Sequence, residues 1–166
     1  MKLAVLNCDE IKPSFSEKFG QYPAMFETAL NNLDIRYNIV SYDIQKGIYP
    51  KNIAENHVYI ITGSQSAVYE KHDWLENLFE FIREINKKEI GLIGICFGHQ
   101  AIAHALGGNV EKAKSGWHIG VKPLEVQDNE LFMKRSYQLI FNHQDQVINP
   151  PSNAVCIGAT KHCRYA

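Results

Sequence analysis

The sequence predicts an α/β fold with a mainly parallel sheet, flanked by helices and extended by antiparallel strands. Up to residue 106, apolar runs typical of strands alternate with helix-like patterns, which favours parallel strands joined by crossover helices. One of these runs stops abruptly at Cys96, between two glycines. Beyond Gly108 the pattern changes to short strand-like segments separated by turns.

The chain begins with a strand, a polar stretch and a helix. Residues 2–7 form an apolar run that predicts a strand, and the polar residues after it, through Gly20, predict a loop. A helix is expected next, because Pro23 suits a first helical position, where its missing N–H needs no partner. Four of its apolar residues recur at i, i+3, i+4 and i+7 and are expected in the core: Phe26, Ala29, Leu30 and Leu33.

Two more strands follow, with an irregular segment between them. Residues 35–42 alternate and are rich in β-branched and aromatic side chains, which predicts a strand. Residues 58–62 form a short apolar run, which predicts a buried strand that ends at Gly63. Residues 43–57 are expected to be irregular.

The next helix has a regular apolar pattern. Asp73 is expected to cap it, with Glu76 three residues on. Its buried side is predicted to contain five residues: Leu75, Leu78, Phe79, Ile82 and Ile85. The charged residues 86–89 end this helix, and residues 90–95 then predict a central strand.

Cys96 is predicted at a sharp turn between that strand and a helix over residues 97–106. Residues 94–98 read GICFG, so small residues stand two positions on either side of the cysteine, as in a nucleophile elbow. The start of a helix favours the thiolate form of such a cysteine and so makes the sulfur nucleophilic. The alternative is a buried core cysteine that packs as a small hydrophobe.

The last third of the chain predicts short strands. Strand-like segments are expected at residues 110–114, 119–126, 138–141 and 154–157. We expect them to complete the same sheet and to add antiparallel strands beside it. With 166 residues, 45% of them hydrophobic, the chain is expected to form a single domain over residues 1–166.

Composition favours a small molecule or another protein as the partner. The formal net charge is -1, with no basic stripe for nucleic acid. The N-terminal apolar run is too short for a signal peptide and no run is long enough to cross a membrane, so we expect a cytoplasmic protein. The four cysteines lack a Cys-x-x-Cys spacing, which favours reduced thiols over a metal site or disulfides: Cys8, Cys96, Cys156 and Cys163. No cofactor is expected.

A cysteine nucleophile also needs oxyanion donors and a base. The N–H of Phe97 directly follows Cys96, and the loop after the preceding parallel strand can offer the N–H of Ser64, although an ordinary tight turn is the alternative there. The seven histidines show no spacing that selects a base. Position favours His143, which follows a predicted strand, and the alternative is a turn histidine bonded to its neighbours.

Four segments resemble the class I glutamine amidotransferases, in particular the glutaminase domain of GMP synthase and its free-standing relatives. They are the loop ITGSQSAVYE, the elbow GICFGHQ, the segment SGWHIG and the segment NHQDQV. The resemblance covers nearly the whole chain, and the order of its motifs is specific. It implies a flavodoxin-like amidotransferase fold.

The resemblance also implies a reaction and its residues. In such proteins a cysteine attacks the side-chain amide of glutamine, releases ammonia and leaves a γ-glutamyl thioester that water hydrolyses. On that pattern Cys96 is the nucleophile, and the N–H groups of Ser64 and Phe97 form the oxyanion hole. The amino-acid end of the substrate would be held by Gln100 and by the backbone of Gln144 and Asp145. A synthetase domain or subunit would receive the ammonia.

The chain departs from the family pattern in two places. Gly63-Ser64-Gln65 stands where the family usually has Gly-Gly-Pro, so the resemblance does not fix the backbone orientation of this loop. The family's base and its carboxylate form a His-x-Glu motif, which residues 1–166 do not contain. His143 belongs to another motif of the family and is assigned to the substrate side. We therefore expect a C-terminally incomplete domain with impaired turnover, or a natural short relative.

Two alternatives stay open at this point. Hydrolysis of another γ-glutamyl amide or peptide would use the same elbow and loop. A catalytically silent binding or regulatory module would keep the fold and lack the base. Whether the gene reads on past Ala166 into a His-x-Glu would discriminate between an enzyme and a silent module.

Overall fold

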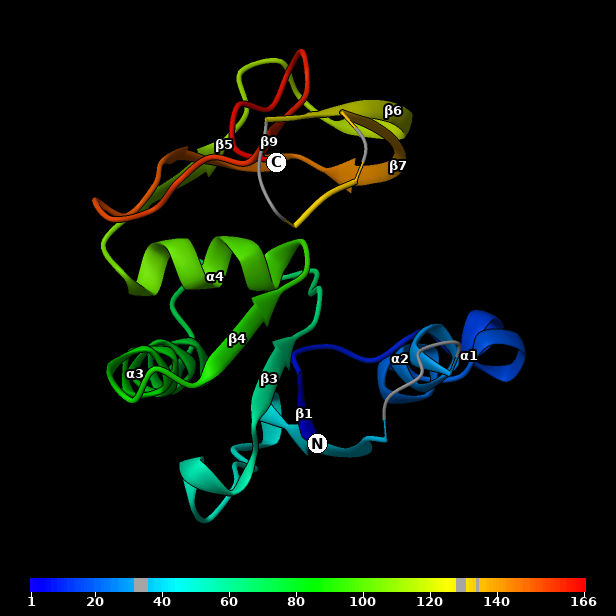
Figure 1. Ribbon diagram of the computed structural model, residues 1–166, viewed down its shortest axis with the longest axis vertical. Coiled ribbons are helices and arrows are strands. Elements are labelled where there is room, and N and C mark those ends of the chain that lie inside the picture. The colour runs from blue at the N-terminus through cyan, green and yellow to red at the C-terminus, as the bar shows by residue number, and fades with distance from the viewer. Residues whose placement is uncertain (32–35, 128–130, 134) are drawn as a thin grey trace. The chain divides into compact units, whose positions relative to one another are not determined.

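The computed structural model describes residues 1–31, 36–127, 131–133 and 135–166. These residues form two compact units, residues 1–102 and residues 103–166. The first unit holds a parallel sheet with helices, and the second holds antiparallel strands (Figure 1). None of the helices in the described ranges has the length and apolar character needed to cross a membrane. The single domain expected from the chain length stays a prediction.

A four-stranded parallel sheet is the centre of the first unit. Its strands are β1 (Lys2–Asn7), β2 (Asn38–Asp43), β3 (Val58–Ile61) and β4 (Gly91–Gly94). They lie in the order β2-β1-β3-β4, and each neighbouring pair is parallel. β1 and β3 carry continuous buried runs, as strands covered on both faces do.

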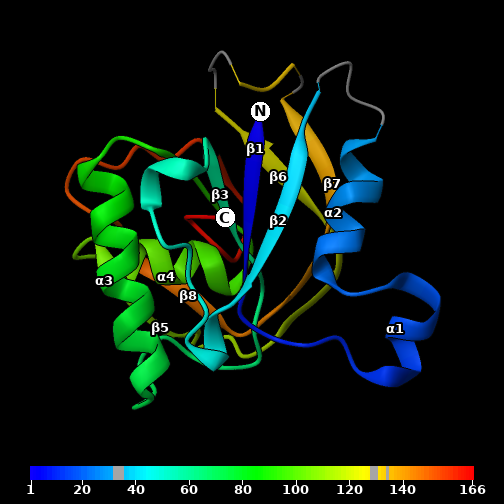
Figure 2. The same cartoon turned by 90° about the horizontal axis from the view of Figure 1, so that it is seen from below.

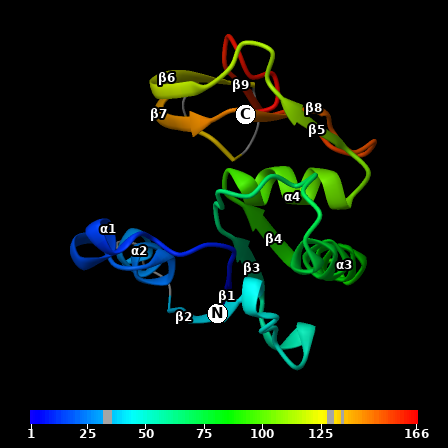
Figure 3. The ribbon, with the colours of Figure 1, turned by 180° about the vertical axis from the view of Figure 1, so that it is seen from behind.

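Helices lie on both sides of this sheet (Figure 2). α2 (Tyr22–Leu30) contacts β1 and β2, while α3 (Asp73–Lys87) contacts β4 and the 3-10 helix η1 (Ile44–Lys46). The view from behind also shows α2 and α3 on opposite sides of the strands (Figure 3). A second 3-10 helix, η2 (Ile53–Glu55), lies in the segment expected to be irregular. The predicted parallel sheet flanked by helices is confirmed.

The buried side of α3 is the one the sequence predicts. Five apolar side chains of this helix are 3% exposed or less: Leu75, Leu78, Phe79, Ile82 and Ile85. The expected cap is off by one residue, because His72 is the N-cap and Asp73 is the first helical residue. Asp73 and Glu76 still lie in the first turn, where the helix dipole favours negative charge.

The loop expected through Gly20 is wrong, because it contains the helix α1 (Pro13–Phe19). None of its residues is buried, and its two apolar residues, Phe15 and Phe19, are too few to form the repeated apolar pattern that predicts a helix. In the next helix, α2, Phe26 and Leu30 are half-buried and Ala29 is exposed. The face expected in the core is therefore only partly covered, and Leu33 lies outside the described residues.

β4 differs from its predicted place in the sheet. Among the described residues it pairs with β3 alone, so it ends the strand order instead of lying in its centre. Its Ile93 is 49% exposed. β2 begins at Asn38, later than the strand predicted from residue 35, which lies outside the described residues.

The second unit contains two antiparallel sheets. β5 (Asn109–Lys112) pairs with β8 (Asp145–Asn149), while β6 (His118–Val126) pairs with β7 (Ser136–His143) and with β9 (Gly158–Ala159). The predicted antiparallel strands are thus confirmed. The expectation that this part completes the parallel sheet is wrong for the described residues, because these strands form sheets of their own. Residues 154–157 form no strand, and the chain enters β9 only after them.

Candidate active site

Cys96 lies at the junction of β4 and α4 (Phe97–Ala105) with a positive φ of 53°. For a residue other than glycine, this left-handed backbone conformation costs about 1–3 kcal/mol and persists only where the surrounding structure enforces it. Backbone bonds enforce it here: the N–H of Ile95 donates to the carbonyl of Ile61 (3.0 Å), and the N–H of Gln100 donates to the carbonyl of Cys96 (3.2 Å). Cys96 is exposed. The chain therefore presents this thiol to solvent at the start of a helix.

The two glycines around Cys96 allow the sharp turn. A Cβ atom on Gly94 would overlap the backbone of Gly98, and one on Gly98 would overlap the carbonyl of Ile61. The same Cβ on Gly98 would lie 2.9 Å from the Cβ of Ile61. Backbone atoms in a packed sheet cannot move aside as a flexible side chain does, so the turn requires glycine at both positions.

The loop of residues 63–66 lies beside Cys96. β3 and β4 are neighbouring parallel strands, so their carboxyl ends meet at one edge of the sheet. A Cβ atom on Gly63 would lie 4.0 Å from the Cβ of Cys96 and 3.6 Å from the hydroxyl oxygen of Tyr22. The structure therefore brings together the elbow and the loop that carries the predicted donor Ser64.

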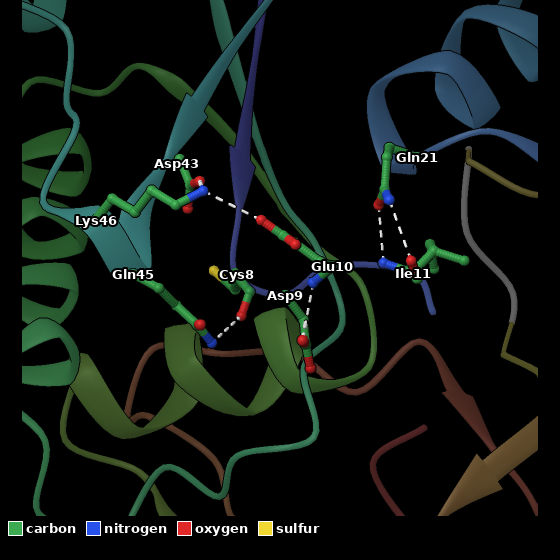
Figure 4. Close-up of polar contacts among 8 residues, drawn as sticks. All are labelled: Cys8, Asp9, Glu10, Ile11, Gln21, Asp43, Gln45 and Lys46. Atoms are coloured by element: carbon green, nitrogen blue, oxygen red, sulfur yellow. Dashed lines mark hydrogen bonds and ion pairs between the residues drawn. The ribbon is translucent and has the colours of Figure 1, made fainter. Parts of the chain in front are cut away.

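The segment after β1 reaches the same edge and is held by polar contacts (Figure 4). The side-chain N–H of Gln45 donates to the carbonyl of Cys8 (2.7 Å). The side chain of Gln21 accepts from the N–H of Ile11 (2.8 Å) and donates to its carbonyl (3.1 Å). These contacts fix the segment around Asp9 against η1 and the start of α2.

Tyr22 lies near this site, and the sequence does not predict it there. Burial raises the pKa of its phenol, and the negative charge of Asp9 raises it further. The phenol therefore stays protonated and can donate a hydrogen bond near Cys96. The sequence carries no signal for this, because a tyrosine in the first turn of a helix is compatible with core, surface and site positions alike.

The other cysteines lie in less reactive surroundings. Burial raises the pKa of Cys8 to about 12 and also raises the pKa of Cys163. Cys156 is half-buried, and its sulfur lies 3.2 Å from the carbonyl of Arg164. A thiol with a pKa near 12 has roughly a thousandfold smaller thiolate fraction than an ordinary thiol.

We expect iodoacetamide to alkylate Cys96 faster than the other three cysteines. The thiolate is the reactive form, and only Cys96 is both exposed and at a helix start. Brief labelling at neutral pH followed by peptide mapping measures the order. Equal labelling of all four cysteines would contradict the special environment assigned to Cys96.

The remaining predicted residues are divided between the two units. Gln100 is in the first turn of α4, and its side chain is only 7% exposed. Gln144 and Asp145 belong to the second unit, where the carbonyl of Gln144 accepts from the N–H of Ala113 (3.0 Å) and the carbonyl of Asp145 lies 3.0 Å from Nδ1 of His143. Their roles in substrate binding stay predictions.

Three histidines gather in the second unit. His118 is 4% exposed, its ring stacks on His143 with centroids 5.4 Å apart, and it meets His162 edge-on at 5.5 Å. Burial, followed by the nearby charges of His143, His162 and Lys122, lowers the pKa of His118. Within the described ranges, no group of three or more His, Cys, Asp or Glu side chains is arranged to hold a metal ion.

We expect the second unit to lose stability as the pH falls below about 6.5, the ordinary histidine pKa. The pKa of His118 is lower in the folded state, so the unfolded state binds more protons below that pH. Its contribution is fully present above the unfolded pKa and is lost as the pH drops. Urea unfolding at pH 7.5 and 5.5, followed by Trp117 fluorescence in a Trp74→Phe background, measures this.

His118→Gln should reduce this pH dependence, whereas His72→Gln, which changes an exposed histidine of the first unit, should leave it unchanged. A pH dependence that survives His118→Gln in full would show that another group is responsible.

Comparison with known proteins gives concordant matches. Residues 17–165 match the model of the glutamine amidotransferase class-I family. The chain is 28% identical over 155 residues to γ-glutamyl peptidase 2 of Arabidopsis thaliana, covering 89% of this chain and 62% of the peptidase. It is 29% identical over 174 residues to the glutamine-hydrolysing GMP synthase of Limosilactobacillus reuteri, covering 99% of this chain and 31% of the synthase.

A solved structure shares the fold. The glutamine amidotransferase of Thermotoga maritima superimposes with a TM-score of 0.81 at 24% identity, covering 98% of this chain and 69% of that one. The chain therefore spans less than two thirds of the peptidase and about a third of the GMP synthase.

Proposed function

This chain belongs to the glutamine amidotransferase class-I family, and we propose that it cleaves glutamine or another γ-glutamyl amide through a thioester at Cys96. One observation carries the proposal: Cys96 is exposed, with a strained positive φ, at the start of α4 and beside the loop of residues 63–66. Strain of this kind in a solvent-facing thiol is a common mark of a functional position.

In the proposed reaction the Cys96 thiolate attacks the carbonyl carbon of the γ-amide. A C–S bond forms, and the carbonyl electrons move onto oxygen. The N–H groups of Ser64 and Phe97 are proposed to stabilise that oxyanion. When the carbonyl re-forms, the C–N bond breaks, and the amine takes up a proton and leaves. Water then adds to the thioester, and glutamate and the Cys96 thiol are released.

Two substrate classes fit this chemistry. The similarity to GMP synthase supports glutamine as the substrate, with the ammonia passing to a synthetase domain or subunit. The similarity to a γ-glutamyl peptidase supports a γ-glutamyl peptide as the substrate, since this chain covers 62% of the peptidase and 31% of the synthase. Both classes share the γ-glutamyl group, and they differ in the amine that leaves.

Proton transfer to that amine is the demanding step. Residues 1–166 contain no His-x-Glu, so we propose that they turn over unactivated amides slowly. Loss of a general acid–base group typically costs about 10²- to 10⁴-fold. Substrates whose leaving group needs no proton, such as γ-glutamyl thioesters, bypass this step and are suited to testing Cys96.

The test compares matched γ-linked and α-linked substrates. Glutamine, glutathione and a γ-glutamyl thioester are incubated with the protein, and glutamate release is measured beside that from the α-glutamyl thioester with the same leaving group. We expect release from γ-linked substrates only, with the thioester fastest. Equal release from both thioesters would mean that the γ-glutamyl group is not recognised. No release from any substrate would favour the catalytically silent module.

A further inference from the structure

We infer that Thr62 and Asp9 are positioning residues that set the direction of the Ser64 N–H before substrate binds. This rests on the proposed function, because it concerns the oxyanion loop of that reaction. The chain lacks the Gly-Gly-Pro that the resemblance would place in this loop. Instead, the side chains of Thr62 and Asp9, which follow the neighbouring strands β3 and β1, hold this loop in position.

Thr62 follows β3 and is fully buried. Its hydroxyl oxygen accepts a hydrogen bond from the N–H of Cys8 (2.9 Å), and the hydroxyl donates to the carbonyl of Gly63 (3.0 Å). The N–H of Thr62 donates to the carbonyl of Leu6 (3.2 Å). The hydroxyl thus links the end of β1 to the first carbonyl of the loop, through one buried and one partly buried hydrogen bond.

This carbonyl determines where the predicted oxyanion donor points. The carbonyl of Gly63 and the N–H of Ser64 belong to one planar trans peptide unit, in which they point in opposite directions. As long as the Thr62 hydroxyl holds the carbonyl, the Ser64 N–H is directed away from Thr62. Rotating this peptide would leave the buried Thr62 hydroxyl without its acceptor.

Asp9 holds the next peptide of the loop. Its carboxylate accepts from the N–H of Gln65 (2.8 Å) and, through its other oxygen, from the N–H of Glu10 (2.8 Å). Gln65 stands where the family pattern has proline, which has no N–H to hold. The carboxylate of Asp9 therefore supplies by a hydrogen bond the restraint that a proline ring would supply covalently.

The experiment compares two reactions of Cys96 that differ in their need for the loop. Acylation by a γ-glutamyl thioester passes through a tetrahedral oxyanion, whereas alkylation by iodoacetamide displaces iodide at a saturated carbon and forms none. Thr62→Val removes the hydroxyl at nearly constant shape, and Thr62→Ser keeps it. Intact-mass spectrometry follows both rates.

We expect Thr62→Val to slow acylation about 10²-fold, close to the loss of one oxyanion donor. Alkylation should change less than about twofold, because the thiolate itself is untouched. Thr62→Ser should acylate within about threefold of the unsubstituted protein, since the hydroxyl remains. Acylation of Thr62→Val at the unsubstituted rate, or equal slowing of both reactions, would overturn the inference.

Asp9 provides a second pair of variants if Thr62→Val fails to fold. Asp9→Asn keeps an oxygen acceptor for the Gln65 N–H, and Asp9→Ala removes it. Only Asp9→Ala should slow acylation. We expect a slowing of about tenfold, which corresponds to the typical net contribution of one hydrogen bond. Equal acylation by both Asp9 variants overturns the role of Asp9. If the unsubstituted protein is not acylated at Cys96, the proposed function itself fails.

Discussion

Cys96→Gly is expected to lose γ-glutamyl acylation completely and to be more stable than Cys96→Ala by about 1 kcal/mol. Both variants remove the sulfur, so neither can form a thioester. They differ in backbone strain, because glycine adopts a φ of 53° at little cost and alanine does not. The positive φ that places the Cys96 thiol at the turn would thus lower the free energy of unfolding of the protein.

Urea unfolding of both variants measures this difference in the free energy of unfolding. Circular dichroism before unfolding serves as the control that both variants are folded. Equal stabilities would mean that the positive φ at Cys96 is not a source of strain. Residual acylation in either variant would place the reactive thiol elsewhere.

Gly98→Ala is expected to destabilise the first unit by about 3 kcal/mol or more. The added methyl group would overlap the carbonyl of Ile61, and relieving that overlap requires β3 and α4 to move apart. Overpacking of a well-packed interior typically costs about 1–3 kcal/mol, and backbone overlap is at the severe end of that range. Thermal unfolding followed by circular dichroism measures the loss.

Gly63→Ala is the matched control for Gly98→Ala. The same methyl group at Gly63 would make only ordinary contacts, 3.6 Å from the Tyr22 hydroxyl and 4.0 Å from the Cβ of Cys96. The variant should therefore fold with nearly unchanged stability. Similar melting temperatures for Gly63→Ala and Gly98→Ala would contradict the close approach of α4 to β3.

The parts of the fold with a strong apolar period could be predicted from the sequence. β1 is a continuous buried run, and α3 buries five residues at helical spacing. α1 could not be predicted, because none of its residues is buried and its seven residues contain only two apolar ones, Phe15 and Phe19. β8 has no counterpart among the predicted strands. Its last two residues are exposed, and its partner strand β5 is far away in the sequence, so no local pattern marks it.

The candidate site likewise has a part that could be predicted from the sequence and a part that could not. The Cys96 elbow has a local motif, because its two glycines are needed within five residues of chain. The contacts of Thr62 and Asp9 have none, since they join residues 54 and 56 positions apart. Tyr22 likewise lies near Gly63 through the packing of α2 against the sheet. Spacing along the chain cannot reveal such pairs.

The identity of the residue that carries the γ-glutamyl group tests the proposed mechanism most directly. The protein is mixed with a γ-glutamyl thioester, quenched in acid before the adduct hydrolyses, digested and mapped by mass spectrometry. We predict a single γ-glutamyl adduct, on the peptide that contains Cys96, and none in Cys96→Ala. An adduct on Cys8, Cys156 or Cys163, or a fully unmodified Cys96 after prolonged reaction, would contradict the proposed mechanism.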